Sequence, residues 1–155
     1  MKNVVLRCQV LCLLAVSVFY AQSMVAQESP SAAKGCSGAT LRGSFGYTST
    51  GTLLESYVPP PFAGPFGETG RQTFDGKGNT NATATVSSNG NISTVSINGT
   101  YTVNSDCTGS MTLNIPDFDT TVHANFVIDD NGTELRAIST DSGVIETRVY
   151  TKQCH

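Results

Sequence analysis

The segment TVSINGTYTV, residues 94–103, alternates polar and apolar side chains along its whole length. Val95, Ile97, Tyr101 and Val103 fall on one side, and mostly Thr, Ser and Asn fall on the other. A period of two is typical of a β-strand that buries one face and exposes the other to water. The segment therefore predicts an antiparallel sheet with a single buried face.

Clusters of Gly, Asn and Asp divide the chain on both sides of this segment. They are DGKGN at 75–79, SSNGN at 87–91, NSDCTG at 104–109, DDNG at 129–132 and DSG at 141–143. Turn signals that recur roughly every 8–12 residues, with alternating segments between them, are typical of sandwiches and barrels built from hairpins. The chain is therefore expected to be all-β.

Eight strands are expected, joined mostly by short turns, which favours a single antiparallel eight-stranded barrel. A Greek-key sandwich is the alternative. The expected strands are Leu41–Thr48, Phe66–Phe74, Thr80–Ser87, Thr94–Val103, Thr108–Ile115, Thr121–Ile128, Thr133–Ser139 and Val144–Thr151. Gly43, Gly46, Gly70 and Gly99 suit the bends of a small barrel. Helix is expected only near the N-terminus, since no other window spaces its apolar residues helically.

The N-terminus has the pattern of a secretory signal peptide. Lys2 and Arg7 precede an apolar run over 10–20, and Ala21-Gln22-Ser23 offers small residues for cleavage. We expect a signal peptide over 1–23, a flexible leader over 24–35 and a barrel domain over 36–155, in a secreted or periplasmic protein.

The expected mature chain is acidic. Without Lys2 and Arg7 it keeps seven basic residues against twelve acidic ones, a net charge of −5. This balance argues against nucleic acid as a partner, and no second apolar run could hold the processed protein in a membrane. No cofactor or metal motif is recognised; an oligomer is compatible with the sequence.

Chain direction assigns the cysteines of the domain to one end of such a barrel. Cys36 precedes the first strand, Cys107 lies in the turn after the fourth, and Cys154 follows the eighth. Export favours a disulfide, Cys36–Cys107 first and Cys36–Cys154 as the alternative. A zinc site that adds His155 has the right ligand number but lacks the usual CxxC spacing. The opposite end carries the long 49–65 link and the turns at 116–120 and 140–143.

Four stretches carry a resemblance to known proteins: LRGSFGYTSTG at 41–51, GRQTFDGKGN at 70–79, NGTYTVNSDCTGS at 98–110 and ANFVIDDNGTELRAI at 124–138. They resemble a group of uncharacterised secreted bacterial proteins of this size. That group is distantly similar to the allene oxide cyclase and dirigent barrels. The resemblance implies a barrel that binds or steers a hydrophobic molecule without a cofactor.

Alternation also places polar residues inside the barrel. Glu68 falls on the apolar face of its strand, and Glu146 and Arg148 share a face with Val144 and Tyr150. Candidate catalytic residues are Glu68, Glu146, Arg148 and Tyr47. The expected ligand-binding set is Phe45, Tyr47, Tyr57, Phe62, Phe66, Glu68, Gln72, Phe118, Glu146, Arg148 and Tyr150. A one-residue slip of the last strand would instead turn Ile145, Thr147 and Val149 inward.

Three functions remain open at this point. The first is a secreted binding barrel for a small hydrophobic or aromatic ligand, and the second is a cofactor-free cyclase or isomerase. The third is a surface or matrix protein with a filled core. A cavity above about 300 Å³ with convergent polar groups would favour the first two. His123 is expected on the outer face, and no nucleophile motif joins it to suggest hydrolysis.

Overall fold

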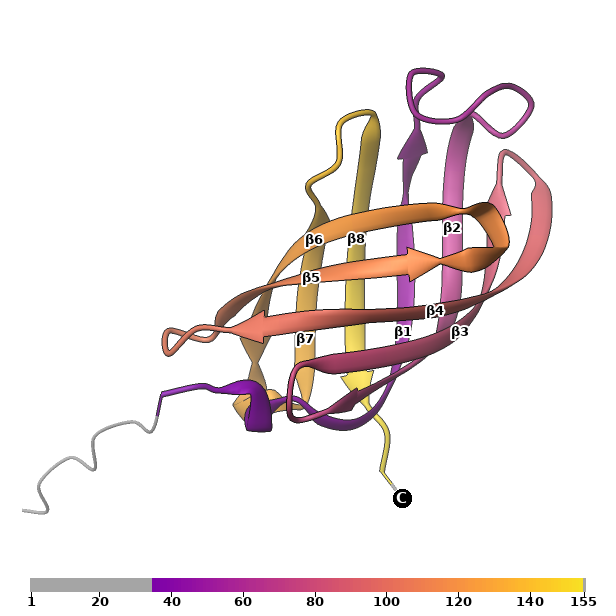
Figure 1. Cartoon of the computed structure of the whole chain (residues 1–155). Coiled ribbons are helices and arrows are strands. Elements are labelled where there is room, and N and C mark those ends of the chain that lie inside the picture. Colours follow the sequence, from indigo (N-terminus) through magenta and orange to yellow (C-terminus); the bar gives the residue numbers. More distant parts are fainter. Residues whose placement is uncertain (1–34, 155) are drawn as a thin grey trace, which may run out of the picture. The chain divides into compact units, whose positions relative to one another are not determined.

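The computed structural model describes residues 35–154, so the expected signal peptide and most of the expected leader lie outside the described residues. It confirms a closed, all-antiparallel, eight-stranded barrel in which each strand pairs with its neighbours in sequence and β8 pairs with β1 (Figure 1). The strands are β1 Arg42–Leu53, β2 Gly64–Asp75, β3 Asn79–Ser88, β4 Asn91–Val103, β5 Thr108–Ile115, β6 Thr120–Asp129, β7 Glu134–Ser139 and β8 Val144–Lys152. In Figure 1, β4, β5 and β6 cross β7, β8, β1 and β2 at a steep angle.

The first hairpin differs from the expectation. β1 continues to Leu53 and β2 begins at Gly64, so the link spans 54–63 instead of 49–65. The extra residues pair with β8, where Ser49 lies opposite Arg148 and Leu53 opposite Val144. The sequence did not reveal this extension, because it consists mostly of Ser, Thr and Gly and so lacks the apolar alternation of a strand. Ser49 nevertheless points inward, where its hydroxyl donates a hydrogen bond to the buried carboxylate of Glu146.

Short helical turns occur outside the N-terminal segment, which corrects the expectation that helix would be confined there. They are the 3-10 turns Gly38–Thr40, Pro116–Phe118 and Asp130–Gly132. Each is a single turn, too short for helical periodicity to reveal it in the sequence.

We call the half of the barrel that carries Cys36 and Cys107 the lower half. A packed aromatic core fills it. The ring of Phe74 packs edge-on against those of Phe45 and Tyr101, at centroid distances of 5.4 and 5.2 Å. Tyr150 is fully buried beside them, and the Tyr101 hydroxyl donates to the Leu41 carbonyl oxygen at 3.0 Å. This lower half therefore leaves little room for a ligand.

A disulfide fastens the lower end. It joins Cys36 to Cys107, as expected, while Cys154 is free and exposed. The alternative Cys36–Cys154 pairing is therefore wrong. The bond also uses two of the four residues that the zinc alternative required.

Two glycines let neighbouring strands approach closely. A Cβ atom at Gly99 of β4 would lie 2.1 Å from the Thr112 carbonyl oxygen of β5. One at Gly70 of β2 would lie 2.5 Å from the Thr83 carbonyl oxygen of β3. Both positions accept only glycine without movement of the backbone, as the sequence suggested for a tightly curved barrel.

Between residues 35 and 154, no helix is long and apolar enough to cross a membrane.

Candidate ligand-binding cavity

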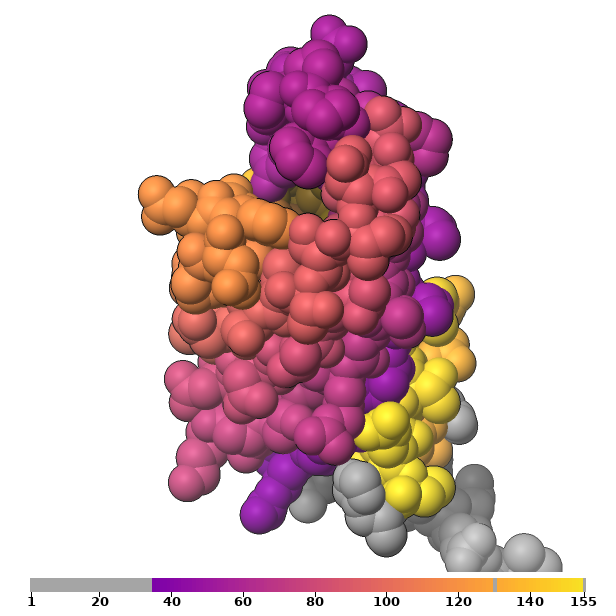
Figure 2. All heavy atoms as spheres, turned by 90° about the vertical axis from the view of Figure 1, so that its right-hand side faces the viewer, coloured from indigo at the N-terminus to yellow at the C-terminus, as the bar shows by residue number. Residues whose placement is uncertain are grey.

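The upper half of the barrel is hollow. A cavity of about 410 Å³ opens beneath the 54–63 loop. Figure 2 shows a hollow between that loop, the β5–β6 turn and the β3–β4 turn. Its lining consists of Leu53, Tyr57, Val58, Pro59, Phe62, Phe66, Glu68, Val86, Ser88, Asn91, Ser93, Ile115, Phe118, Thr120, Val122, Val144, Glu146 and Arg148.

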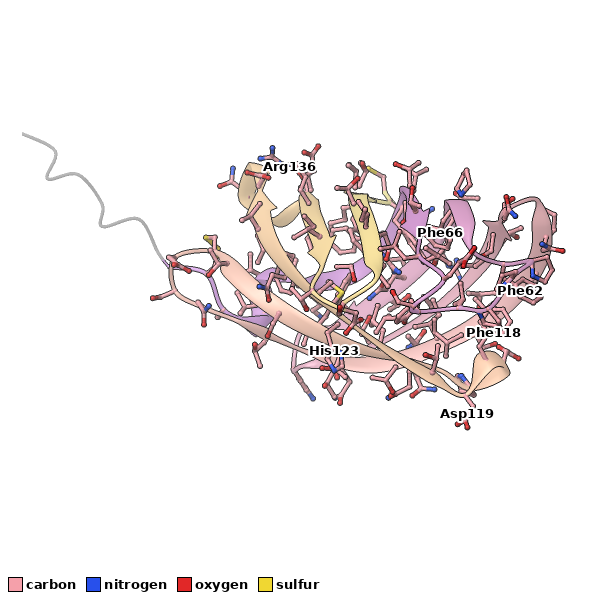
Figure 3. The ribbon with its side chains drawn as sticks, turned by 90° about the horizontal axis from the view of Figure 1, so that it is seen from above. Phe62, Phe66, Phe118, Asp119, His123 and Arg136 are labelled. Atoms are coloured by element: carbon pink, nitrogen blue, oxygen red, sulfur yellow. A yellow bond between two sulfur atoms is a disulfide. The ribbon has the colours of Figure 1, made fainter. Side chains whose placement is uncertain are left out.

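Aromatic rings form much of the mouth. Tyr57 and Phe62 come from the 54–63 loop, Phe66 from β2, and Phe118 from the 3-10 turn between β5 and β6. Viewed from above, Phe62, Phe66 and Phe118 lie at the same end of the barrel (Figure 3). Phe62 is 44% and Phe118 52% exposed, so large apolar side chains meet water at the rim of the cavity. Such a rim is typical of a site that buries further apolar surface when a ligand enters.

Charged residues form the floor. Arg148 Nε donates to Glu146 Oε1 at 2.5 Å, and Arg148 Nη2 lies 3.5 Å from Glu68 Oε2. The Tyr47 hydroxyl donates to Glu68 Oε1, and the Ser49 hydroxyl donates to Glu146 Oε1. We call Tyr47, Ser49, Glu68, Glu146 and Arg148 the polar floor. All five side chains are buried, so their mutual pairing is needed to offset the loss of hydration.

Burial determines the protonation of this floor. It raises the pKa of Glu68, although Arg148 and the hydrogen bond from Tyr47 oppose that rise. Burial, followed by the adjacent Glu68 carboxylate, also raises the pKa of Tyr47, which therefore remains a hydrogen-bond donor. Arg148 stays charged, and its guanidinium carbon lies 5.7 Å from the centre of the Tyr47 ring. Glu68 therefore keeps a proton to a higher pH than an exposed glutamate does.

Glu68→Gln is expected to stabilise the empty protein increasingly as pH rises. A raised folded-state pKa means that the folded protein holds the Glu68 proton more tightly than the unfolded chain does. The protonated Glu68 therefore contributes to the stability of the wild-type protein. This contribution is complete below the ordinary glutamate pKa of 4.5, and it is lost as pH rises through the folded-state pKa of Glu68. In denaturant unfolding from pH 4 to 8, the free energy of unfolding of the variant should therefore rise relative to that of wild type. Glu55→Gln, at an exposed residue of the 54–63 loop, is the matched control. A difference for Glu68→Gln that stays constant with pH would contradict the assignment.

The predicted site residues separate into two groups. Seven line the cavity: Tyr57, Phe62, Phe66, Glu68, Phe118, Glu146 and Arg148. Four do not, namely Phe45, Tyr47, Gln72 and Tyr150, which are buried in or beside the lower core. Tyr47 nevertheless joins the floor through Glu68. The alternative register of the last strand is wrong, because Ile145 and Val149 are 63% and 46% exposed while Glu146 and Arg148 are buried.

Several lining residues were not predicted. Val86, Val122, Val144 and Ile115 all fall on inward faces, so period-two alternation could have identified them. Ser49, which joins the polar floor through Glu146 but does not line the cavity, was missed because it lay beyond the expected end of its strand.

His123 lies on the outer face, as expected, with a partner that the sequence did not reveal. Its Nδ1 lies 2.8 Å from Asp141 Oδ1, and its backbone N–H donates to Asp141 Oδ2 at 2.7 Å. Asp141 belongs to the β7–β8 turn, and Thr140 N donates to the His123 carbonyl oxygen. These contacts connect β6 to the turn between β7 and β8.

Within residues 35–154 no group of three His, Cys, Asp or Glu side chains could hold a metal ion.

Comparisons with known proteins identify the architecture. No family model matches the chain, and no curated protein matches it. It is similar to a redesigned β-barrel at a TM-score of 0.54 and 19% identity, over 76% of this chain and 95% of that one. A second redesigned barrel, bound to DFHBI, aligns at a TM-score of 0.50 and 18% identity, over 74% of this chain and 97% of that one. A third structure, also bound to DFHBI, aligns at a TM-score of 0.51 and 15% identity, over 74% of this chain and 94% of that one. At these identities the likeness shows a shared fold, the small closed eight-stranded β-barrel.

Proposed function

We propose that this protein is a binding barrel that holds one small, largely apolar or aromatic molecule in its upper cavity. The observation that carries the proposal is a cavity of about 410 Å³ with aromatic walls and a convergent polar floor. This volume lies in the range of small-molecule sites. It corresponds to about 14 water molecules at their volume in the liquid, enough for a molecule of one to three rings.

Two further features support a binding role. The lower half of the barrel is filled and fastened by the Cys36–Cys107 disulfide, so the cavity stands on a rigid base. Two of the similar barrels are bound to the small aromatic dye DFHBI. A hollow upper half also argues against a structural protein whose core is filled throughout.

We further propose that the chain is exported and related to the secreted bacterial barrels that its sequence resembles. The disulfide is compatible with an oxidising compartment. The similarity to allene oxide cyclase and dirigent barrels stays a proposal of the same kind.

Binding can be tested with N-phenylnaphthylamine, a neutral dye whose fluorescence rises in apolar surroundings. Protein made from the full chain should bind the dye saturably, with one site. Val122→Trp should weaken binding at least about tenfold, because Val122 lines the cavity and a larger ring would occupy it.

Val127→Trp is the matched control for this test. Val127 belongs to the same strand, faces outward and lines a more open hollow on the outer surface of β4–β8. The control should change the affinity less than about twofold. Loss of binding in Val127→Trp with full binding in Val122→Trp would move the site to the outer surface and contradict the proposal.

A cofactor-free isomerase is the second candidate, favoured by one observation. Glu68 combines cavity access with a pKa raised by burial, as a general acid or base requires. Arg148 and Tyr47 could stabilise developing charge beside it. If so, the protein should accelerate hydrogen–deuterium exchange next to the carbonyl of a bound two-ring ketone such as tetralone, and Glu68→Gln should abolish the acceleration. If exchange is no faster than in buffer, the isomerase proposal is contradicted and binding remains as the proposed function.

A further inference from the structure

The charges at the cavity floor do not balance. Two carboxylates, Glu68 and Glu146, share the single guanidinium of Arg148. Arg148 is also the only Lys, Arg or His among the described residues that line the cavity. With both carboxylates ionised, the floor carries one excess negative charge. An uncompensated buried charge is costly, so this cavity has a deficit of one cation or one proton.

Carboxylate oxygens at the floor remain free to accept further hydrogen bonds. Glu146 Oε1 accepts from Ser49 and Arg148, while none of the described residues donates a hydrogen bond to Glu146 Oε2. Glu68 Oε2 meets Arg148 Nη2 only at 3.5 Å. Arg148 Nη1 is buried and also lacks a hydrogen-bond partner among the described residues. A ligand in the cavity therefore meets two carboxylates and a single guanidinium, which already faces both of them.

The walls also suit a cation. Rings of Tyr57, Phe62, Phe66 and Phe118 surround the upper cavity, and the faces of aromatic rings attract ammonium groups. We propose that the ligand is an aromatic amine in its protonated form, whose ammonium group binds at the carboxylates of Glu68 and Glu146 while its rings fill the apolar upper cavity. This inference rests on the proposed function, because it names the class of molecule that the same cavity binds.

Proton and ligand compete for the same charge. In the empty protein, burial raises the pKa of Glu68, so a proton can supply the missing positive charge. The charged and titratable groups around Glu68 are Tyr47 on β1 and Glu146, Arg148 and Tyr150 on β8. A bound ammonium displaces the Glu68 proton. Affinity for the amine should therefore increase with pH while Glu68 is protonated, by at most tenfold per pH unit, and level off above its pKa.

Three probes of nearly equal size test the inference on full-chain protein by calorimetry: naphthylmethylamine, which is a cation, naphthylmethanol, which is neutral, and naphthoate, which is an anion. At pH 8 the amine should bind at least about tenfold more tightly than the alcohol, a difference of about 1.4 kcal/mol. Naphthoate should bind more weakly than the alcohol. The preference for the amine should shrink as pH falls through the folded-state pKa of Glu68, while the probe remains protonated.

Variants locate the preference. Glu68→Gln should remove the excess charge, bring the ratio of amine affinity to alcohol affinity, measured on the same variant, to about one, and abolish the pH dependence of that ratio. Glu55→Gln removes an acidic charge from the exposed 54–63 loop without touching the cavity, and it should leave the preference intact. Thermal melts of both variants show that each is folded.

The outcomes distinguish this inference from the proposed function. Binding of the alcohol without any preference for the amine would overturn the cation inference and leave the binding role standing. A preference that survives Glu68→Gln, or that Glu55→Gln abolishes, would also overturn it, because the charge responsible would lie elsewhere. Failure of all three probes together with N-phenylnaphthylamine would overturn the proposed function itself.

Discussion

Arg148→Ala should lower the free energy of unfolding by about 3–5 kcal/mol, because it leaves two carboxylates buried without their shared guanidinium. Denaturant unfolding at pH 7 measures the loss. Arg136→Ala is a matched control, since Arg136 makes an ion pair of similar length, 2.7 Å to Asp129, at the surface. Arg136→Ala should cost much less stability than Arg148→Ala, because water screens an exposed ion pair.

A compensated variant separates the charge from the packing. In Glu68→Gln/Glu146→Gln/Arg148→Met the floor keeps its approximate volume and loses all formal charge. It should recover most of the stability lost in Arg148→Ala, as replacement of buried ion networks by neutral groups often does. If Arg148→Ala unfolds like Arg136→Ala, the guanidinium is not holding buried carboxylates, and the account of the floor fails.

Loss of the Cys36–Cys107 disulfide should have an effect of similar size. The bond connects residues separated by 71 positions, and closing so long a loop stabilises by about 4 kcal/mol in the chain-entropy model. Cys36→Ala/Cys107→Ala should show this loss in denaturant unfolding. Cys154→Ala, which removes the exposed free thiol, should shift stability by about 0.5 kcal/mol or less. If reductant leaves the unfolding of wild type unchanged, the predicted bond is absent in the isolated protein.

The architecture could be predicted from the sequence because each strand alternates over most of its length. TVSINGTYTV lies within β4, and the turn clusters separate the strands on both sides of it. Chain direction in an antiparallel barrel then placed Cys36 near Cys107 with no pairing information. The same alternation placed Glu146 and Arg148 inside, since Val144 and Tyr150 occupy the same face and are buried.

The division of the interior could not be predicted. Alternation distinguishes inside from outside, but it does not tell whether an inward side chain lies in a filled layer or beside a cavity. Phe45 and Phe66 are both inward aromatic residues, yet Phe45 is fully buried in the core and Phe66 lines the cavity. That difference depends on height along the barrel, which follows from strand stagger and from the 54–63 loop.

Individual polar contacts were also beyond sequence reasoning. Ser49 joins Glu146 across 97 positions of the chain, and His123 joins Asp141 across 18. Both contacts depend on the pairing register of the strands, which is set only when the barrel folds. The chemistry of the floor follows from these long-range contacts, so its charge imbalance became visible only in three dimensions.

A crystal structure of the full chain with naphthylmethylamine is the most direct test of the central claim that the upper cavity is the ligand site. The account predicts the rings among Phe62, Phe66 and Phe118, with the ammonium nitrogen within hydrogen-bond distance of a carboxylate oxygen of Glu68 or Glu146. Ligand bound only on the outer surface of β4–β8, or a cavity closed by inward movement of Phe62 and Phe118 with no ligand at saturating concentration, would contradict it.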